Sequence, residues 1–168
     1  EKKIKNSSKK FFTVLQYADG NLFETSSITY FAASGLKVDF MNSDTKLIKI
    51  PLLAEKHHKQ LRTFDKKFLA SFIGRNTHPI RENLIKEFGD NSAFYIEVFD
   101  EPVISDERQK KFVDLMNSSF FSLAPRGYGV TSYRLYESFE FGTVPVYISN
   151  EKEYYLPFED IIDWKKLC

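Results

Sequence analysis

The sequence predicts an α/β fold in which a Rossmann-like parallel sheet is flanked by helices. From residue 68 onward, short apolar segments alternate with amphipathic segments, which is typical of parallel strands joined by right-handed helical crossovers. Turn residues separate these segments. With 42% hydrophobic and 28% charged residues among 168, the composition is that of a globular protein and argues against disorder.

Three short strands are expected in the first part of the chain. Phe11–Tyr17 is rich in aromatic and β-branched residues and precedes a turn signal at residues 18–21. Thr29–Ala33 has the same character. Leu47–Leu52 contains Pro51, which would end the strand or place it at a sheet edge. Polar segments separate these strands, so no regular alternation with helices is visible here.

A tighter pattern begins at Phe68. The apolar run Phe68–Ile73 predicts a strand that is buried on both faces. A helix is expected next, capped by Thr77, with Pro79 in its first turn and Gly89 at its end. Its apolar stripe consists of Ile80, Leu84, Ile85 and Phe88.

The remaining chain continues the alternation of strands and helices. The expected elements are strand Ala93–Phe99, a helix from Ser105 or Asp106 to Asn117, strand Phe120–Ala124, helix Thr131–Phe141 ended by Gly142, and strand Val144–Ser149. The side chain of Asn117 heads an Asn-Ser-Ser sequon but abuts a strand that should be buried, which argues against glycosylation there.

A phosphate site is expected between the last two strands. The loop there reads Arg126-Gly127-Tyr128-Gly129, and Thr131 or Ser132 caps the following helix. Glycines let the backbone approach a ligand, arginine offers a forked donor to phosphate oxygens, and a helix N-terminus favours an anion. A Gly-rich loop alone is weak evidence, because any tight βα turn can use one. Combined with the arginine in the loop and Glu137 in the following helix, it predicts a nucleotide site.

Glu137 allows two interpretations. It lies three residues after Arg134, so the two side chains could form an ion pair on an exposed helix face, worth about 0.3–0.5 kcal/mol. Alternatively, its carboxylate could accept hydrogen bonds from ribose hydroxyls, as the acidic residue of dinucleotide-binding folds does. The spacing leaves both open.

A second βα corner is expected at the same edge of the sheet. It contains Gly74 and Arg75 and continues to Arg81. Both arginines could reach a diphosphate, although a surface position is as compatible with Arg81. His57 and His58 have no partner at metal-ligand spacing and predict a solvated loop.

Several classes of function are disfavoured. A net charge of +1 gives no reason to expect nucleic acid as a partner. No Gly-x-Gly-x-x-Gly motif is present, which argues against NAD or FAD. No apolar run approaches the roughly 18 residues of a membrane span. The single cysteine, Cys168, excludes an internal disulfide framework and favours the cytoplasm.

These motifs closely resemble the exostosin family of glycosyltransferases, family 47. The resemblance is carried by Pro125-Arg126-Gly127, Arg134-Leu135-Tyr136-Glu137, Gly142-Thr143-Val144-Pro145-Val146, Leu156-Pro157-Phe158 and Ile162-Asp163-Trp164. Upstream, Ile50-Pro51-Leu52 and Phe72-Ile73-Gly74-Arg75 fit less specifically.

The resemblance implies a two-lobed GT-B fold, of which this chain would be a fragment. Residues 1–52 would be the remnant of the N-terminal, acceptor-side lobe, residues 53–65 a linker, and residues 66–168 most of the nucleotide-sugar-binding lobe. Closing helices would follow the end of this chain. Missing segments could provide a membrane anchor, and with it a Golgi location, or a contact for a hetero-oligomer.

The resemblance further implies sugar transfer from a nucleotide-sugar to a glycan or other hydroxyl acceptor, with inversion and without a metal ion. A UDP-sugar is favoured over a GDP-sugar, Arg126 would contact the diphosphate, and Glu137 the ribose. The predicted donor-binding residues are Gly74, Arg75, Arg126, Gly127, Tyr128, Gly129, Thr131, Ser132 and Glu137. The catalytic base would lie outside the fragment. The alternative is a catalytically silent lobe that acts as a folding or assembly partner.

Overall fold

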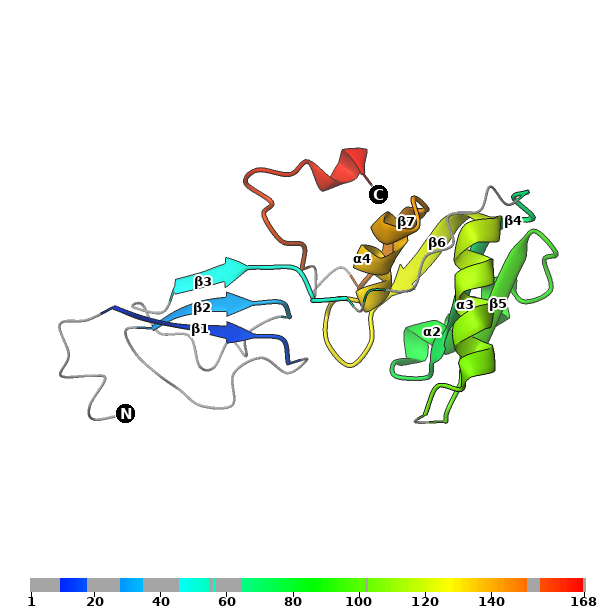
Figure 1. Cartoon of the computed structure of the whole chain (residues 1–168), viewed down its shortest axis with the longest axis horizontal. Coiled ribbons are helices and arrows are strands. Elements are labelled where there is room, and N and C mark those ends of the chain that lie inside the picture. Colours follow the sequence, from blue (N-terminus) through cyan, green and yellow to red (C-terminus); the bar gives the residue numbers. More distant parts are fainter. Residues whose placement is uncertain are drawn as a thin grey trace.

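Two parallel β-sheets lie end to end in the structure (Figure 1). It is a computed structural model that describes residues 10–17, 28–34, 46–54, 56, 65–101, 103–150 and 155–167. The expected turn at residues 18–21, the pair His57 and His58, and most of the expected linker lie outside the described residues. The division of the chain into lobes stays a prediction.

The first sheet contains the three strands expected early in the chain. They are β1 (Phe11–Leu15), β2 (Ile28–Ala32) and β3 (Lys46–Lys49), in the order β1-β2-β3. Strands β1 and β3 end earlier than the sequence suggested. The Gln16 side chain donates to the carbonyl of Pro51 at 3.3 Å and accepts from the amide of Leu53 at 2.9 Å. These bonds hold the segments that follow β1 and β3 against each other at the carboxyl edge.

The second sheet confirms the predicted α/β class. Its strands are β4 (Phe68–Arg75), β5 (Phe94–Phe99), β6 (Ser119–Pro125) and β7 (Val144–Ile148), all parallel and in the order β5-β4-β6-β7. The helices are α2 (Pro79–Phe88), α3 (Asp106–Ser118) and α4 (Tyr133–Glu140). The chain leaves β4 toward β5 and then returns to form β6 on the other side of β4, so the direction of winding changes between β4 and β6.

Helices cover both faces of the second sheet. On one face, Phe72 of β4 packs in a cluster with Leu84 of α2 and Leu123 of β6. On the other, Ile73 packs with α3, whose buried residues are Phe112, Leu115 and Met116. Alternate residues of β4 therefore enter opposite layers, which explains the continuous apolar run of that strand.

A side chain caps the N-terminus of each of the helices α2, α3 and α4. The predicted cap was wrong for α2. Ser105 caps α3 and Ser132 caps α4, both within the expected alternatives. For α2, however, the cap is His78 and not Thr77, because His78 Nδ1 accepts from the amide of Ile80 at 3.2 Å. The residue before a proline is held in an extended conformation, and His78 (φ −163°, ψ 142°) precedes Pro79. An extended residue is what an N-cap requires.

The C-terminal segment joins the two sheets. Tyr155 donates its hydroxyl to the carbonyl of Ala32 at the end of β2, and Lys49 of β3 forms an ion pair with Glu159. Further on, the indole of Trp164 donates to the carbonyl of Pro157 at 2.7 Å. Burial raises the pKa of Tyr155, so its phenol stays a donor. Leu156 and Trp164 of the same segment pack with Ala124 of β6 and Leu135 of α4, so the segment contacts both sheets.

Two surface expectations can be compared with the structure. Asn117 is buried, and its side chain donates to the carbonyl of Val113 at 2.9 Å, as expected for a sequon beside a buried strand. Within the described ranges, no helix is long and apolar enough to cross a membrane.

Candidate functional site

A cavity of about 550 Å³ lies between the carboxyl edges of the two sheets. Gln16, Tyr17, Ser34 and Leu52 line it from the first sheet, where each follows a strand. The other wall comes from the end of β4, the loops after β4 and β6, and the N-terminal parts of α2, α3 and α4. This volume is within the range of small-molecule sites.

The position of the cavity follows from the winding of the second sheet. Ligands of open α/β sheets bind outside the carboxyl ends of the strands, at the point where the winding direction changes. That point lies between β4 and β6 here, and the loops after these two strands line the cavity. The topology and the cavity therefore indicate the same site.

All predicted donor-binding residues except Arg126 line this cavity. Arg126 is 7% exposed, and its Nη2 donates to the carbonyl of Tyr128 at 3.4 Å. Its backbone carbonyl accepts from Arg81 Nε at 2.9 Å. The expected contact between Arg126 and a diphosphate stays a prediction.

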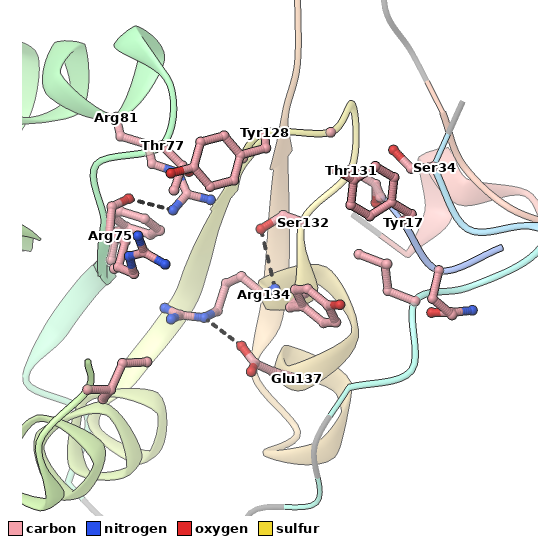
Figure 2. Close-up of a pocket in the computed structure, with 18 of the residues that line it drawn as sticks. Tyr17, Ser34, Arg75, Thr77, Arg81, Tyr128, Thr131, Ser132, Arg134 and Glu137 are labelled. Atoms are coloured by element: carbon pink, nitrogen blue, oxygen red, sulfur yellow. Dashed lines mark hydrogen bonds and ion pairs between the residues drawn. The ribbon is translucent and has the colours of Figure 1, made fainter. Parts of the chain in front are cut away.

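Glu137 forms the predicted ion pair, but not on an exposed face. Its Oε2 lies 3.1 Å from Arg134 Nε, and the side chains of Glu137 and Arg134 are 15% and 11% exposed. Arg134 also donates to the carbonyl of Ile73 at 2.8 Å, and its guanidinium lies 4.4 Å from the centre of the Phe112 ring. Both side chains line the cavity (Figure 2). The two interpretations of Glu137 are thus compatible with each other.

The cavity wall carries an excess of positive charge. Arg75, Arg81 and Arg134 line it together with one carboxylate, Glu137. Burial and the charges of Arg134 and Arg75 lower the pKa of Arg81 to about 10, so its guanidinium group remains protonated at neutral pH. In Figure 2, Arg75 and Arg81 lie near each other, with Arg134 pointing toward them. Such a wall favours an anionic ligand.

Three polar atoms on this wall lack a partner. Arg75 Nε, Thr77 Oγ1 and Thr131 Oγ1 are buried without a hydrogen-bond partner among the described residues. They come from the end of β4 and from the loops after β4 and β6, which flank the change of winding. Buried polar groups are normally satisfied, so orphaned ones call for an explanation, and the three residues that carry them all line the cavity.

The sequence reasoning had not placed Phe72, Thr77 or Arg134 in the site, yet all three line the cavity. The sequence predicts a helix cap for Thr77, and it places Arg134 on an exposed face in one of the two interpretations of Glu137. The available signal was the position of Thr77 directly after β4 and of Arg134 in the first turn of α4. Among the described residues, no three His, Cys, Asp or Glu side chains are grouped so as to hold a metal ion.

The cap of α2 predicts a pH dependence of stability. Burial, and then the charges of Arg126 and Arg81, lower the pKa of His78. The folded state therefore releases a proton that the unfolded state retains below about pH 6.5. The stabilisation is complete above about pH 6.5 and is lost as the pH falls below it, because protonated Nδ1 cannot accept from the Ile80 amide.

His78→Asn is the matched variant, because asparagine also caps helices but does not titrate. The melting temperature, followed by circular dichroism, should fall more steeply in wild-type protein than in this variant between pH 7.5 and pH 5.5. Parallel decreases in the two proteins would contradict the assignment.

Comparison with known proteins identifies the family. The chain matches the exostosin GT47 domain over residues 18–168. A "Probable glycosyltransferase" of Arabidopsis thaliana is 32% identical over 98 residues, which cover 58% of this chain and 19% of the plant protein. Exostosin-1 of Drosophila melanogaster is 44% identical over 52 residues, which cover 31% of this chain and 7% of the fly protein.

A third relative is a moss protein, "Probable glucuronosyltransferase 47 A" of Physcomitrium patens. It is 35% identical over 81 residues, which cover 47% of this chain and 18% of the moss protein. The chain thus spans less than a fifth of the length of each of these three relatives. Because the family match covers most of the sequence, this chain belongs to the exostosin GT47 family.

Proposed function

We propose that the parent protein of this chain is a glycosyltransferase and that this chain binds its nucleotide-sugar donor. The acceptor would be a hydroxyl of a glycan or of another molecule. Membership of the exostosin GT47 family supports the reaction class. One structural observation carries the assignment of the donor site. Arg75, Thr77 and Thr131, each of which carries a buried polar atom without a partner among the described residues, line a cavity with an excess of arginine charge.

A nucleoside diphosphate fits the chemistry of this wall. Phosphate oxygens accept hydrogen bonds, and the wall offers donors in Arg75 Nε and in the hydroxyls of Thr77 and Thr131. The N-terminus of α4, capped by Ser132, lies at the same wall and favours an anion. The ribose hydroxyls would donate to the Glu137 carboxylate, which also pairs with Arg134.

The proposed reaction is a displacement at the anomeric carbon with inversion. An oxygen of the acceptor hydroxyl forms a bond to that carbon while the bond to the diphosphate oxygen breaks. The hydroxyl proton passes to a base that we expect outside this chain, and the nucleoside diphosphate leaves with the bonding electron pair. Arginines of the cavity would stabilise the developing negative charge, so we propose that no metal ion is required.

The proposal predicts nucleotide binding by this chain. Isotope-labelled protein would be titrated with UDP, GDP and CMP, and the amide chemical shifts would be followed by NMR. We expect saturable shifts at Gly74, at Gly127 to Thr131 and at Glu137 with UDP, with weaker binding of GDP. CMP is the control that lacks the diphosphate. A folded sample that shows no saturable shift with any nucleotide would contradict the proposal.

A catalytically silent lobe is the second candidate function. Two observations favour it: Glu137 is already engaged by Arg134, and Arg126 does not line the cavity. Such a lobe would act as a folding or assembly partner of an active homologue. The nucleotide affinity of Glu137 variants, argued in the Discussion, distinguishes the two candidates.

A further inference from the structure

Arg81 makes an unusual set of hydrogen bonds for a residue on a surface helix. Its guanidinium donates to three backbone carbonyls, from Nη1 to Arg75 at 2.7 Å, from Nε to Arg126 at 2.9 Å and from Nη2 to Pro125 at 3.2 Å. These carbonyls lie at the ends of β4 and β6 and at the start of the loop after β6. One side chain of α2 thus ties together the carboxyl ends of two strands.

The loop after β6 is fitted closely around this side chain. A Cβ atom at Gly127 would lie 3.2 Å from Arg81 Nη2 and 3.2 Å from Thr77 Oγ1, tighter than ordinary van der Waals contact. Glycine therefore allows the loop to approach both side chains. On its other side, the guanidinium lies 5.2 Å from the centre of the Phe72 ring. The position of Arg81 is fixed by hydrogen bonds and by packing.

Arg81 is bound to carbonyls and to no carboxylate among the residues that the structure describes. Three donors in a planar fork can reach three acceptors at once, which a lysine ammonium on a flexible stem cannot reproduce. The charge itself is not neutralised by these bonds and adds to the positive potential of the wall. Because the donors of Arg81 are bound to backbone carbonyls, Arg75 and Thr77 are better candidates than Arg81 for direct contact with a ligand.

We propose that Arg81 is a positioning residue for a diphosphate subsite, because it holds the loops after β4 and β6 together so that Arg75, Thr77 and Gly127 face one ligand. This inference rests on the proposed function. It also predicts an effect in the absence of ligand: the two loops should lose order when the Arg81 guanidinium group is replaced.

Three variants of the full chain test the inference. Arg81→Lys keeps the charge but loses the fork, and Arg81→Met loses both. Lys86→Met is the control, because it removes a positive charge from an exposed position in the last turn of the same helix. If Arg81→Met does not fold, Arg81→Lys decides alone.

The first measurement is amide hydrogen exchange of the nucleotide-free variants. We expect faster exchange in both Arg81 variants at the loops after β4 and β6, with unchanged exchange in Lys86→Met. Informative amides are those of Asn76, which donates to the carbonyl of Phe99 at 2.7 Å, and Gly127, which donates to that of Thr131 at 3.4 Å. Wild-type protection of both loops in Arg81→Lys would overturn the positioning role.

The second measurement compares UDP with uridine by NMR titration. In both Arg81 variants we expect UDP affinity to fall by about 10- to 100-fold, while uridine affinity stays within about threefold of wild type. Equal losses for UDP and uridine would overturn the assignment to a diphosphate subsite. Wild-type protein that binds no nucleotide would contradict the proposed function, and the exchange data would still decide whether Arg81 positions the loops.

Discussion

Phe72→Ala is expected to lower the free energy of unfolding by about 3–5 kcal/mol, the usual cost of emptying an aromatic position in a core. Phe72 is 1% exposed and packs in a cluster with Leu84 and Leu123. The ring also supports the site, because the guanidinium groups of Arg81 and Arg134 lie 5.2 and 5.5 Å from its centre. The substitution therefore removes core volume and the surface on which two cavity arginines rest.

Urea denaturation followed by circular dichroism would measure this loss. Phe72→Leu separates the two roles of the ring, because leucine keeps much of the volume but has no π face. We expect it to cost less than about 1.5 kcal/mol and still to weaken UDP binding. Phe120→Ala is the control, since Phe120 is 55% exposed and should change stability by no more than about 0.5 kcal/mol. A loss below about 1 kcal/mol in Phe72→Ala would contradict this account of the core.

Local patterns were sufficient to predict the second sheet. The apolar run of β4 and the stripe of α2 identified those elements to within about two residues, as periodicity does for strongly patterned segments. The wrong cap of α2 was also a local matter. Thr77 is a good capping residue, but the proline at position 79 fixes the conformation of His78 before it. The pre-proline restriction would have identified the cap.

Side-chain direction at the site could not be predicted in the same way. Arg126 and Arg134 lie eight residues apart around the same loop. The sequence predicts Arg126 in the site and places Arg134 on an exposed face in one of two interpretations. In the structure Arg126 is buried, and Arg134 turns toward the carbonyl of Ile73 at the end of β4. That carbonyl is distant in sequence, so spacing within α4 contains no information about it. The same holds for Arg81, whose three acceptors lie on two different strands and the loop that follows.

Glu137→Ala is expected to lower the stability of the protein. It should also strengthen the binding of pyrophosphate and weaken the binding of UDP through its ribose hydroxyls. Removal of the carboxylate takes away a charged hydrogen bond from Arg134, at a cost of about 1.5–3 kcal/mol in the free energy of unfolding. The guanidinium stays in place through its bond to the carbonyl of Ile73, with its charge no longer compensated. Pyrophosphate should therefore bind more tightly to the variant than to wild-type protein.

Ribose recognition should be lost in the same variant. If Glu137 accepts from ribose hydroxyls, wild-type protein prefers UDP to 2′,3′-dideoxy-UDP by about tenfold or more, and Glu137→Ala binds the two equally. Glu87→Ala, at an exposed position of α2, should keep the wild-type preference. Calorimetric titration of wild type and both variants with UDP, 2′,3′-dideoxy-UDP and pyrophosphate gives the affinity of each protein for each ligand. If UDP affinity and the preference for ribose hydroxyls are the same in wild type and Glu137→Ala, the carboxylate serves only the ion pair with Arg134, and the silent lobe becomes the better account of this chain.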